Sequence, residues 1–281
     1  MKVLPFKIPK PDSDSLIFQV DKDIKFYDKL HQHEEIQISF VVEGEGTLLV
    51  GDRVNYYKKG DVLVIGGNLP HVFKSDLNAS EQSYMLSLFF TESSFGDHFF
   101  YLEELKEIKP LFKKAIHGFK VLSRNKLLAD YFSKLHKVSK LERFIILLEI
   151  LKICTYAKSV NLSSFQYNKK YTDNEGERMR NIFEYTMNHF EKDISLQTIA
   201  DVANMTKNAF CKYFKKRTNK TYFQFLNELR IENACKLLIK NQDLSIAYIA
   251  EQSGFNNISN FNRQFKFIKK HSPSKYRKVG V

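Results

Sequence analysis

The chain has 281 residues, of which 43% are hydrophobic and 27% are charged, so it is long enough for two domains that each bury a core. Its formal net charge is +12, and this charge is unevenly spread. From residue 171 onward there are 19 basic and 11 acidic side chains, against 25 and 21 in the residues before. Most of the positive excess therefore lies in the C-terminal part, where a polyanionic partner is expected.

The cysteines and the apolar segments exclude two further classes of protein. Cys154, Cys211 and Cys235 are scattered and odd in number, which is typical of reduced cysteines in a cytosolic protein and not of a disulfide scaffold. The first residues lack the apolar run of a signal peptide. The most apolar stretch, residues 144–154, is too short to cross a bilayer. We therefore expect a cytoplasmic protein with no membrane partner.

Short strand-like segments follow one another through the N-terminal third. Residues 36–42 are rich in β-branched side chains, which favour a strand. Residues 47–50 and 53–57 flank Gly51-Asp52, a pattern typical of a hairpin with a two-residue loop. Further strand candidates are residues 62–65, 71–73 and 83–90. Their regular spacing predicts a small antiparallel barrel over about residues 14–92.

Three histidines and a glutamine mark a candidate ligand site in this barrel. His31 and His33 alternate along one expected strand with Glu35, and His71 begins a later one. Together with Gln37 they offer neutral donors and acceptors, which suit a small polar ligand with hydroxyl groups. The sequence contains no nucleophile elbow or phosphate loop, so no catalytic residue and no cofactor is expected.

The middle of the chain is helical by its periodicity. Residues 101–112 and 125–135 are amphipathic, whereas residues 141–154 are apolar on two sides. Each of the two apolar sides of such a helix must be packed against another element. Either the barrel covers one side and a second subunit the other, with Leu148 and Leu151 in the seam, or the helix is buried within its own domain.

A repeat dominates the C-terminal part. Ser195–Met205 returns as Ser245–Phe255 at an offset of 50 residues, and the Phe-x-x-x-Phe-Lys run of residues 210–215 returns at 261–266. Each copy reads as a short helix, a tight turn and a second helix with one apolar stripe. This is the helix-turn-helix pattern of proteins that read DNA in the major groove.

The outward faces of the two second helices carry the candidate DNA contacts. Acidic residues are missing from residues 206–221 and from residues 252–281. The basic and polar side chains that point outward can bind base edges or phosphates. The candidates are Lys207, Asn208, Cys211, Lys212 and Lys215 in the first copy, and Asn257, Ser259, Asn260, Arg263 and Lys266 in the second.

The run from Arg230 to Arg277 resembles the AraC/XylS family of bacterial transcription regulators. The resemblance implies a seven-helix unit in which a long helix, here residues 222–240, joins two helix-turn-helix subdomains. The first corner departs slightly, because it carries Asn204-Met205 where the second carries Gly254-Phe255. The entry angle of the first reading helix can therefore differ from that of the second.

The N-terminal third resembles the cupin-like sensor domain found in the same regulators, through His33, Gly44-x-Gly46, Gly60-Asp61 and Pro70-His71. Cupin enzymes bind a metal with two His and a Glu from their first motif and a His from their second. His31, His33 and His71 fit this set, but Gln37 stands at the carboxylate position and is a poor metal ligand. This departure argues against a catalytic metal site.

The expected fold class is α+β: an N-terminal antiparallel cupin-like β-barrel with central helices, then an all-α domain with two helix-turn-helix subdomains. The boundaries are a ligand-sensing and dimerisation domain at 1–158 with helices at about 100–158, a linker at 159–177, and a DNA-binding domain at 178–281.

The expected function is a sequence-specific transcription regulator, classed as an activator, that responds to a small molecule; the resemblance favours a sugar or related metabolite. Its partners would be promoter DNA, the effector, a second copy of the chain and RNA polymerase. Two alternatives stay open: a metal-dependent cupin enzyme with a DNA-binding tail, and a constitutive regulator whose barrel is only a scaffold.

Overall fold

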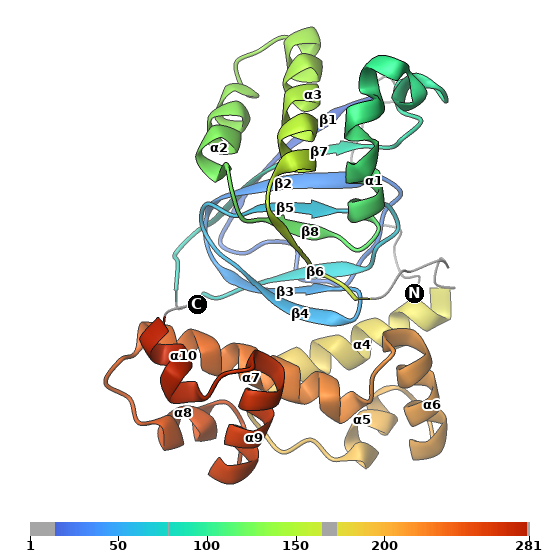
Figure 1. Ribbon diagram of the computed structural model, residues 1–281. Coiled ribbons are helices and arrows are strands. Elements are labelled where there is room, and N and C mark those ends of the chain that lie inside the picture. Colours follow the sequence, from blue (N-terminus) through green and yellow to red (C-terminus); the bar gives the residue numbers. More distant parts are fainter. Residues whose placement is uncertain (1–14, 78, 165–172, 280–281) are drawn as a thin grey trace. The chain divides into compact units, whose positions relative to one another are not determined.

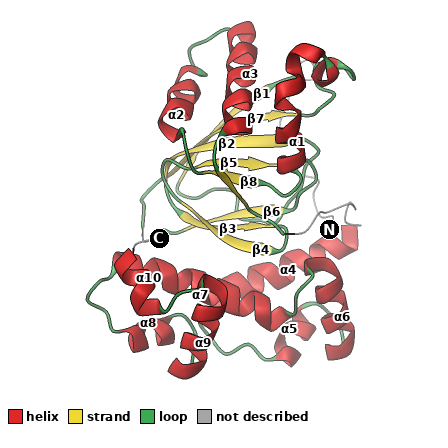
Figure 2. Ribbon diagram, viewed as in Figure 1, coloured by secondary structure: helices red, strands yellow, loops and turns green. Residues whose placement is uncertain are grey.

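The computed structural model describes residues 15–77, 79–164 and 173–279, and the chain divides into two compact units at residues 172/173. The fold class is α+β, as predicted. In the described residues every strand belongs to the first unit, and the second unit is built from helices (Figures 1 and 2). None of the helices in these described residues is long and apolar enough to cross a membrane.

The first unit contains two antiparallel sheets. One has six strands in the order β1-β7-β2-β5-β8-β9, and the other has three in the order β4-β3-β6. The strands are β1 (Ile17–Asp23), β2 (Ile36–Glu43), β3 (Gly46–Val50), β4 (Arg53–Tyr57), β5 (Val62–Ile65), β6 (His71–Ser75), β7 (Ser83–Phe90), β8 (Phe119–Val121) and β9 (Ser159–Asn161).

Alternation along the strands produces two cores. On β2, Ile36 and Ile38 face the helices outside the sheet, whereas Val41 belongs to the core between the two sheets. That inner core also contains Leu48 from β3 and Phe73 from β6. The strand segments expected from residues 36 to 90 are confirmed; β1, β8 and β9 were not predicted.

Helices cover the outer face of the six-stranded sheet (Figure 1). They are α1 (Lys109–Ala115), α2 (Asn125–Lys134) and α3 (Lys140–Tyr156), preceded by the 3-10 turns η1 (Phe99–Tyr101) and η2 (Glu103–Ile108). Residues 101–112 are thus not one helix. Pro110 has no N–H to donate and fits the first turn of a helix, so α1 begins beside it and the preceding residues form 3-10 turns.

Helix α3 begins with a capping box in which the Ser139 side chain accepts from the backbone of Glu142 and the Glu142 side chain accepts from that of Ser139. Leu151 is buried in the core of its own unit, so it cannot belong to a seam with a second subunit. The aliphatic side chains that α3 leaves exposed are Leu141 and Ile145, at 69% and 52%.

The linker expected at 159–177 differs from the structure at both ends. Ser159–Asn161 form β9 and pair with β8 in the first unit, and the helix α4 begins at Asp173. Leu162 lies in the inner core, and Asp52 accepts hydrogen bonds from the side chains of Ser163 and Ser164. Residues 165–172 lie outside the described residues.

Seven helices make up the described part of the second unit. They are α4 (Asp173–His189), α5 (Leu196–Val202), α6 (Lys207–Thr218), α7 (Tyr222–Lys240), α8 (Ile246–Gln252), α9 (Ile258–Lys269) and α10 (Pro273–Val279). The long joining helix predicted over residues 222–240 is α7. It packs between the α5–α6 pair and the α8–α9 pair (Figure 1).

Candidate functional site

The two helices expected to read DNA are set up in the same way. Thr206 caps α6 by accepting from Ala209 N, and Asn257 caps α9 by accepting from Ser259 N and Asn260 N at 2.8 and 3.0 Å. Each helix then buries two phenylalanines, Phe210 and Phe214 in α6 and Phe261 and Phe265 in α9, all with no exposed surface. The opposite face of each helix is left to solvent.

That outer face carries the side chains that the sequence proposed as DNA contacts. Nine of the ten are exposed, and Asn260 is half-buried. The exposed ones are Lys207, Asn208, Cys211, Lys212, Lys215, Asn257, Ser259, Arg263 and Lys266. Each set thus shares one face of its helix.

Some of these side chains already have partners within α9. The carboxamide oxygen of Asn257 serves as the helix cap, so only its amide nitrogen is left for another contact. Arg263 donates to Asn260 Oδ1 at 3.0 Å, which holds the guanidinium against the helix surface. Lys269 is engaged with Glu232 of α7 and is not part of the outer face.

Sequence reasoning missed one exposed aromatic side chain. Phe267 follows the last candidate residue of α9 and is 68% exposed, with the Lys270 ammonium 5.1 Å from its ring centre. Phe261 and Phe265 already form the apolar stripe of α9. A third phenylalanine outside this stripe could therefore have indicated an exposed aromatic side chain from the sequence alone.

The barrel brings the three predicted histidines together. His31 and His71 pair through an isolated β-bridge, with His31 N to His71 O at 3.1 Å and the reverse bond at 2.9 Å. His33 follows in the loop before β2, because the strand begins at Ile36 and not at the first histidine. The ligand atoms of the three rings all lie within 4.8 Å of one another, and all three residues are buried.

Backbone carbonyls fix the ring orientations. His31 Nδ1 lies 2.8 Å from Lys29 O, His33 Nδ1 lies 2.9 Å from Glu35 O, and His71 Nδ1 lies 2.8 Å from Leu69 O. A carbonyl oxygen can only accept, so each neutral ring carries its proton on Nδ1 and presents the lone pair of Nε2.

Gln37 joins this cluster to a polar line inside the barrel. Its Oε1 lies 3.3 Å from His33 Nε2, and its Nε2 donates to Ser39 Oγ at 2.8 Å. Ser39 Oγ in turn lies 2.7 Å from Ser87 Oγ on β7. The polar side chains therefore run across the inner face of β2, where an apolar core would otherwise continue.

A cavity of about 60 Å³ adjoins the cluster. It is lined by His31, His33 and Gln37, by Gln19 and Asp21 from β1, and by Phe26, Tyr27, Phe73, Met85 and Phe89. Burial raises the pKa of Asp21, and the hydrogen bond from Gln19 opposes this shift by lowering the pKa. Burial also lowers the pKa of His33 and, together with the two neighbouring imidazoles, lowers that of His71 well below its ordinary value, so both rings are neutral at pH 7.

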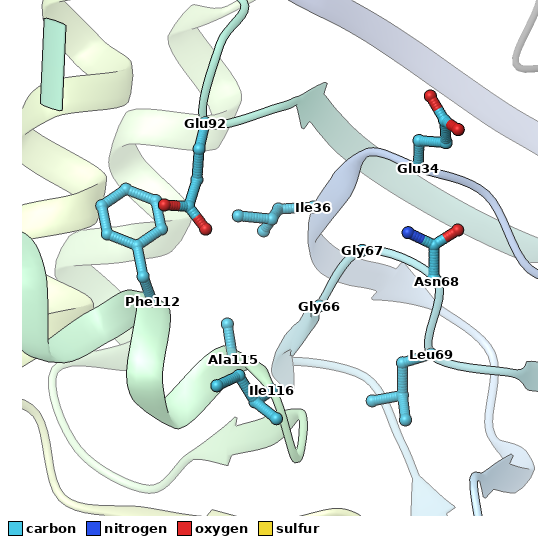
Figure 3. A pocket seen from close by; sticks show the side chains of 10 residues that line it. All are labelled: Glu34, Ile36, Gly66, Gly67, Asn68, Leu69, Glu92, Phe112, Ala115 and Ile116. Atoms are coloured by element: carbon cyan, nitrogen blue, oxygen red, sulfur yellow. The ribbon is translucent and has the colours of Figure 1, made fainter. Parts of the chain in front are cut away.

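A second, open cleft of about 280 Å³ lies outside the barrel, between α1 and the turn after β5 (Figure 3). Glu34 and Glu92 stand on its sides, and Ile36, Phe112 and Ile116 supply apolar surface. None of the predicted ligand residues lines it. The two carboxylates come from separate loops, and no sequence pattern pointed to this cleft.

The three cysteines are free, as expected of reduced residues. Burial raises the pKa of Cys154 and of Cys235 to about 12, so both are inert thiols. Cys211 is exposed on the outer face of α6.

Two family models match the chain in the order that the fold suggests. Residues 24–85 match the model described as a cupin domain, and residues 199–279 match that described as a helix-turn-helix domain. The first match covers strands β2 to β6 with the three histidines, and the second covers α6 to α10.

Relatives that align with most of this chain are transcription regulators. The HTH-type transcriptional regulator YdeC of Bacillus subtilis strain 168 is 22% identical over 270 residues, which is 92% of this chain and 89% of that protein. An HTH-type regulator of Staphylococcus aureus strain COL is 22% identical over 246 residues, or 86% of this chain. The chain spans about a third of the length of that staphylococcal relative (31%).

Solved structures of similar proteins include the C-terminal domain of AraT, a response regulator from Geobacillus stearothermophilus, at 27% identity and a TM-score of 0.35. That likeness covers 36% of this chain and 84% of the other. An apo form of ToxT from Vibrio cholerae is 15% identical with a TM-score of 0.37, over 95% of this chain and 98% of that one.

The repeated helix-turn-helix with its acid-free outer faces, the two matched domains and the full-length relative agree in one assignment. The chain has the two domains of a DNA-binding transcription regulator, a cupin domain in its N-terminal half and an AraC-type helix-turn-helix domain in its C-terminal part.

Proposed function

We propose that this regulator binds promoter DNA with α6 and α9 together, each in a major-groove face on one side of the duplex. The observation that carries the proposal is the duplicated geometry: two capped helices with buried phenylalanine stripes and exposed basic or polar faces. Helix α7 fixes the two copies in one unit, so their spacing on DNA is set by the protein.

The test is a binding titration with the full chain on DNA recovered by genomic footprinting. The double variant Lys212→Ala with Arg263→Ala removes one exposed cation from each outer face, and Lys240→Ala removes an exposed cation at the end of α7 as the matched control. We expect the double variant to lose most specific binding and the control to keep it. Equal affinity of all three proteins would remove α6 and α9 from the interface.

The effector site is proposed at the histidine cluster, with His31, His33, Gln37 and His71 close to the effector. The cavity there is about 60 Å³, whereas pockets for drug-sized molecules have roughly 300–1,000 Å³. Apolar side chains pack between the two sheets beside it, and a cavity of this size does not favour a sugar as the effector. An effector of a few atoms fits the space. It regulates transcription only if it binds the DNA-competent and incompetent arrangements with different affinities.

A homodimer is proposed through the exposed side of α3. Leu141 and Ile145 form an apolar pair one turn apart on that side, and Leu148 continues it half-buried. Ile145→Glu should convert the dimer to a monomer in light scattering while the fold is kept, since the side chain is already more than half exposed. A dimer that persists in this variant places the interface elsewhere.

Two other functions remain as alternatives with their own readouts. A cupin enzyme would need a metal, and the three converging imidazoles are the observation that favours one. A constitutive regulator would bind its promoter equally well whatever occupies the barrel. As a DNA-binding regulator, the protein is expected to act in the cytoplasm together with RNA polymerase.

A further inference from the structure

We infer that His31, His33 and His71 bind one divalent transition-metal ion, and that this ion is the effector that regulates DNA binding. The second part of this inference rests on the proposed function, and the first part stands on the geometry of the barrel alone.

The three rings are oriented as metal ligands before any ion is present. Each Nδ1 faces a backbone carbonyl at 2.8 to 2.9 Å, which leaves the Nε2 lone pair as the ligand atom. A metal-bound histidine usually donates the N–H of its other ring nitrogen to a carbonyl or carboxylate in this way. The ligand atoms lie within 4.8 Å of one another, so small ring rotations bring all three to one ion.

The Nε2 atom of His71 is a second, independent observation that points to a ligand at the cluster. The residue is 1% exposed, and this nitrogen has no hydrogen-bond partner although it is buried. Buried polar atoms are nearly always paired, and an unpaired one calls for a bound water or ion. His33 Nε2 lies 3.3 Å from Gln37 Oε1, and with the ring proton on Nδ1 both of these atoms are acceptors, so this contact does not hold the lone pair.

The charges around the cavity favour a cation over an anion. Asp21 lines it, and Glu35 Oε2 lies 3.7 Å from His33 Nδ1. Among the described residues that line the cavity there is no Lys or Arg. An anionic or phosphorylated effector would meet the carboxyl group of Asp21 there, and none of these described lining residues would supply a fixed positive charge.

The ligand set selects the class of metal. Imidazole nitrogens suit Zn²⁺, Cu²⁺, Ni²⁺ and Fe²⁺, whereas Mg²⁺ and Ca²⁺ require oxygen ligands. Gln37 at the usual carboxylate position removes the negative ligand, so the bound ion keeps its full double charge. Three protein ligands leave an open coordination position, and the adjoining cavity has room for water there.

Hydrogen bonds connect His71 to the last described residues of the first unit, so a bound ion can affect that segment. His71 follows Pro70, whose carbonyl accepts from Gly51 N at 2.8 Å. The next residue, Asp52, holds Ser163 and Ser164, the last described residues of the first unit. An ion that joins His71 to His31 and His33 thus stiffens the strand next to this anchor.

The direct test is metal binding to the full chain stripped with chelator. Co²⁺ gives visible ligand-field bands when four-coordinate, and Zn²⁺ binding is measured by calorimetry and by competition with a chromophoric chelator. We expect one ion per chain in the wild type. His71→Ala and His31→Ala should each weaken binding more than about 100-fold, which exceeds the loss caused by removing a hydrogen-bond partner of a metal ligand. His98→Ala, at an exposed histidine of the same unit, is the matched control and should bind normally.

Gln37→Glu keeps the test decisive if a histidine variant fails to fold. A carboxylate placed beside His33 adds an anionic ligand and should tighten Zn²⁺ binding by at least about tenfold, with a shift of the Co²⁺ bands. The absence of stoichiometric binding in the wild type overturns the inference, and so does binding that survives in both histidine variants.

Regulation is read separately, by titrating promoter DNA with and without Zn²⁺. We expect the ion to change the DNA affinity of the wild type by at least about fivefold and to leave that of His71→Ala unchanged. One bound ion with no change in DNA affinity would retain the site and overturn its regulatory role. A wild type that binds metal but shows no sequence-specific DNA binding in either state would instead contradict the proposed function of α6 and α9.

Discussion

The two helix-turn-helix copies have the same backbone and different surfaces. In the first corner Met205 N donates to Ala200 O at 2.9 Å and Asn204 N to Asp201 O at 2.9 Å. In the second, Phe255 N donates to Ala250 O at 3.0 Å and Gly254 N to Glu251 O at 2.8 Å. The entry angle that the sequence left open is thus governed by one pattern of hydrogen bonds in both copies.

The corner residues show what each copy tolerates. Asn204 and Gly254 both adopt the left-handed conformation, with φ of 52° and 86°. A Cβ at residue 254 would lie 2.5 Å from Phe190 O and 2.8 Å from Arg230 Nε, so the close approach of the end of α4 demands glycine. Arg230 Nε donates to the same Phe190 O, which locks this junction.

The outer faces differ in chemistry. Lys207, Lys212 and Lys215 make the first face a row of point charges, which suits phosphates. Ser259, Asn260 and Arg263 on the second carry directional donors and acceptors, which suit base edges. From this difference we propose that the duplicated scaffold divides anchoring to phosphates and reading of bases between its two copies. Four experiments test that view.

The largest effect is expected in the shared cores. Phe214→Ala and Phe265→Ala each leave a cavity where a fully buried ring stood, and each should destabilise its own subdomain by about 3–5 kcal/mol. Hydrogen exchange resolved by helix reports the local loss. Phe214 also contacts the rings of Phe183, Tyr222 and Phe225, so its removal should spread to α4 and α7. A loss below 1 kcal/mol in either copy would show that the copies are not packed alike.

The corner variants come next. Gly254→Ala introduces a left-handed alanine whose Cβ meets Phe190 O, and it should cost roughly 2–3 kcal/mol. Asn204→Gly, at the matched residue, should change stability by less than about 1 kcal/mol. Denaturant unfolding of the full chain measures both. Equal costs at the two positions would contradict the argument from the end of α4.

Variants of Arg263 and Lys212, which occupy equivalent positions in the two copies, can distinguish base recognition from phosphate binding. Arg263→Ala should weaken specific binding by about 1–3 kcal/mol and relax the choice of base at its site. Lys212→Ala should weaken specific and random DNA alike and reduce the salt dependence of binding by about one counterion. Anisotropy titrations at several salt concentrations give both numbers. The division of roles is lost if the two variants behave identically.

The smallest effect is expected at the caps of the first helices. Ser195 Oγ accepts from Thr198 N at 3.0 Å and Ser245 Oγ from Tyr248 N at 3.1 Å, so the caps are equivalent. Ser195→Ala and Ser245→Ala should each cost about 1 kcal/mol, seen as a small drop in the midpoint of unfolding. A cost in one copy only would mean that tertiary contacts hold the other helix start.

Local rules explain why much of this protein was predictable. The repeat, the phenylalanine spacing and the two-residue loop at Gly51-Asp52 are read within a few residues of one another, and the structure has helices α5 to α9 and the β3–β4 hairpin where these patterns lie. Pro110 was present in the sequence, yet the periodicity over residues 101–112 outweighed it, and the continuous helix expected there was wrong.

The sequence by itself determined the order of the two units, the duplicated helix pairs and the residue types on their outer faces, because capping, periodicity and charge act locally. Only the tertiary structure decided that Ser159–Asn161 pair with β8 and that Leu151 is buried within its own unit, because strand pairing and burial join distant residues. It also decided that His31, His33 and His71 converge. A period-two pattern gives the face of a strand, but it cannot give the bridge between His31 and His71 or the carbonyls that turn each ring inward.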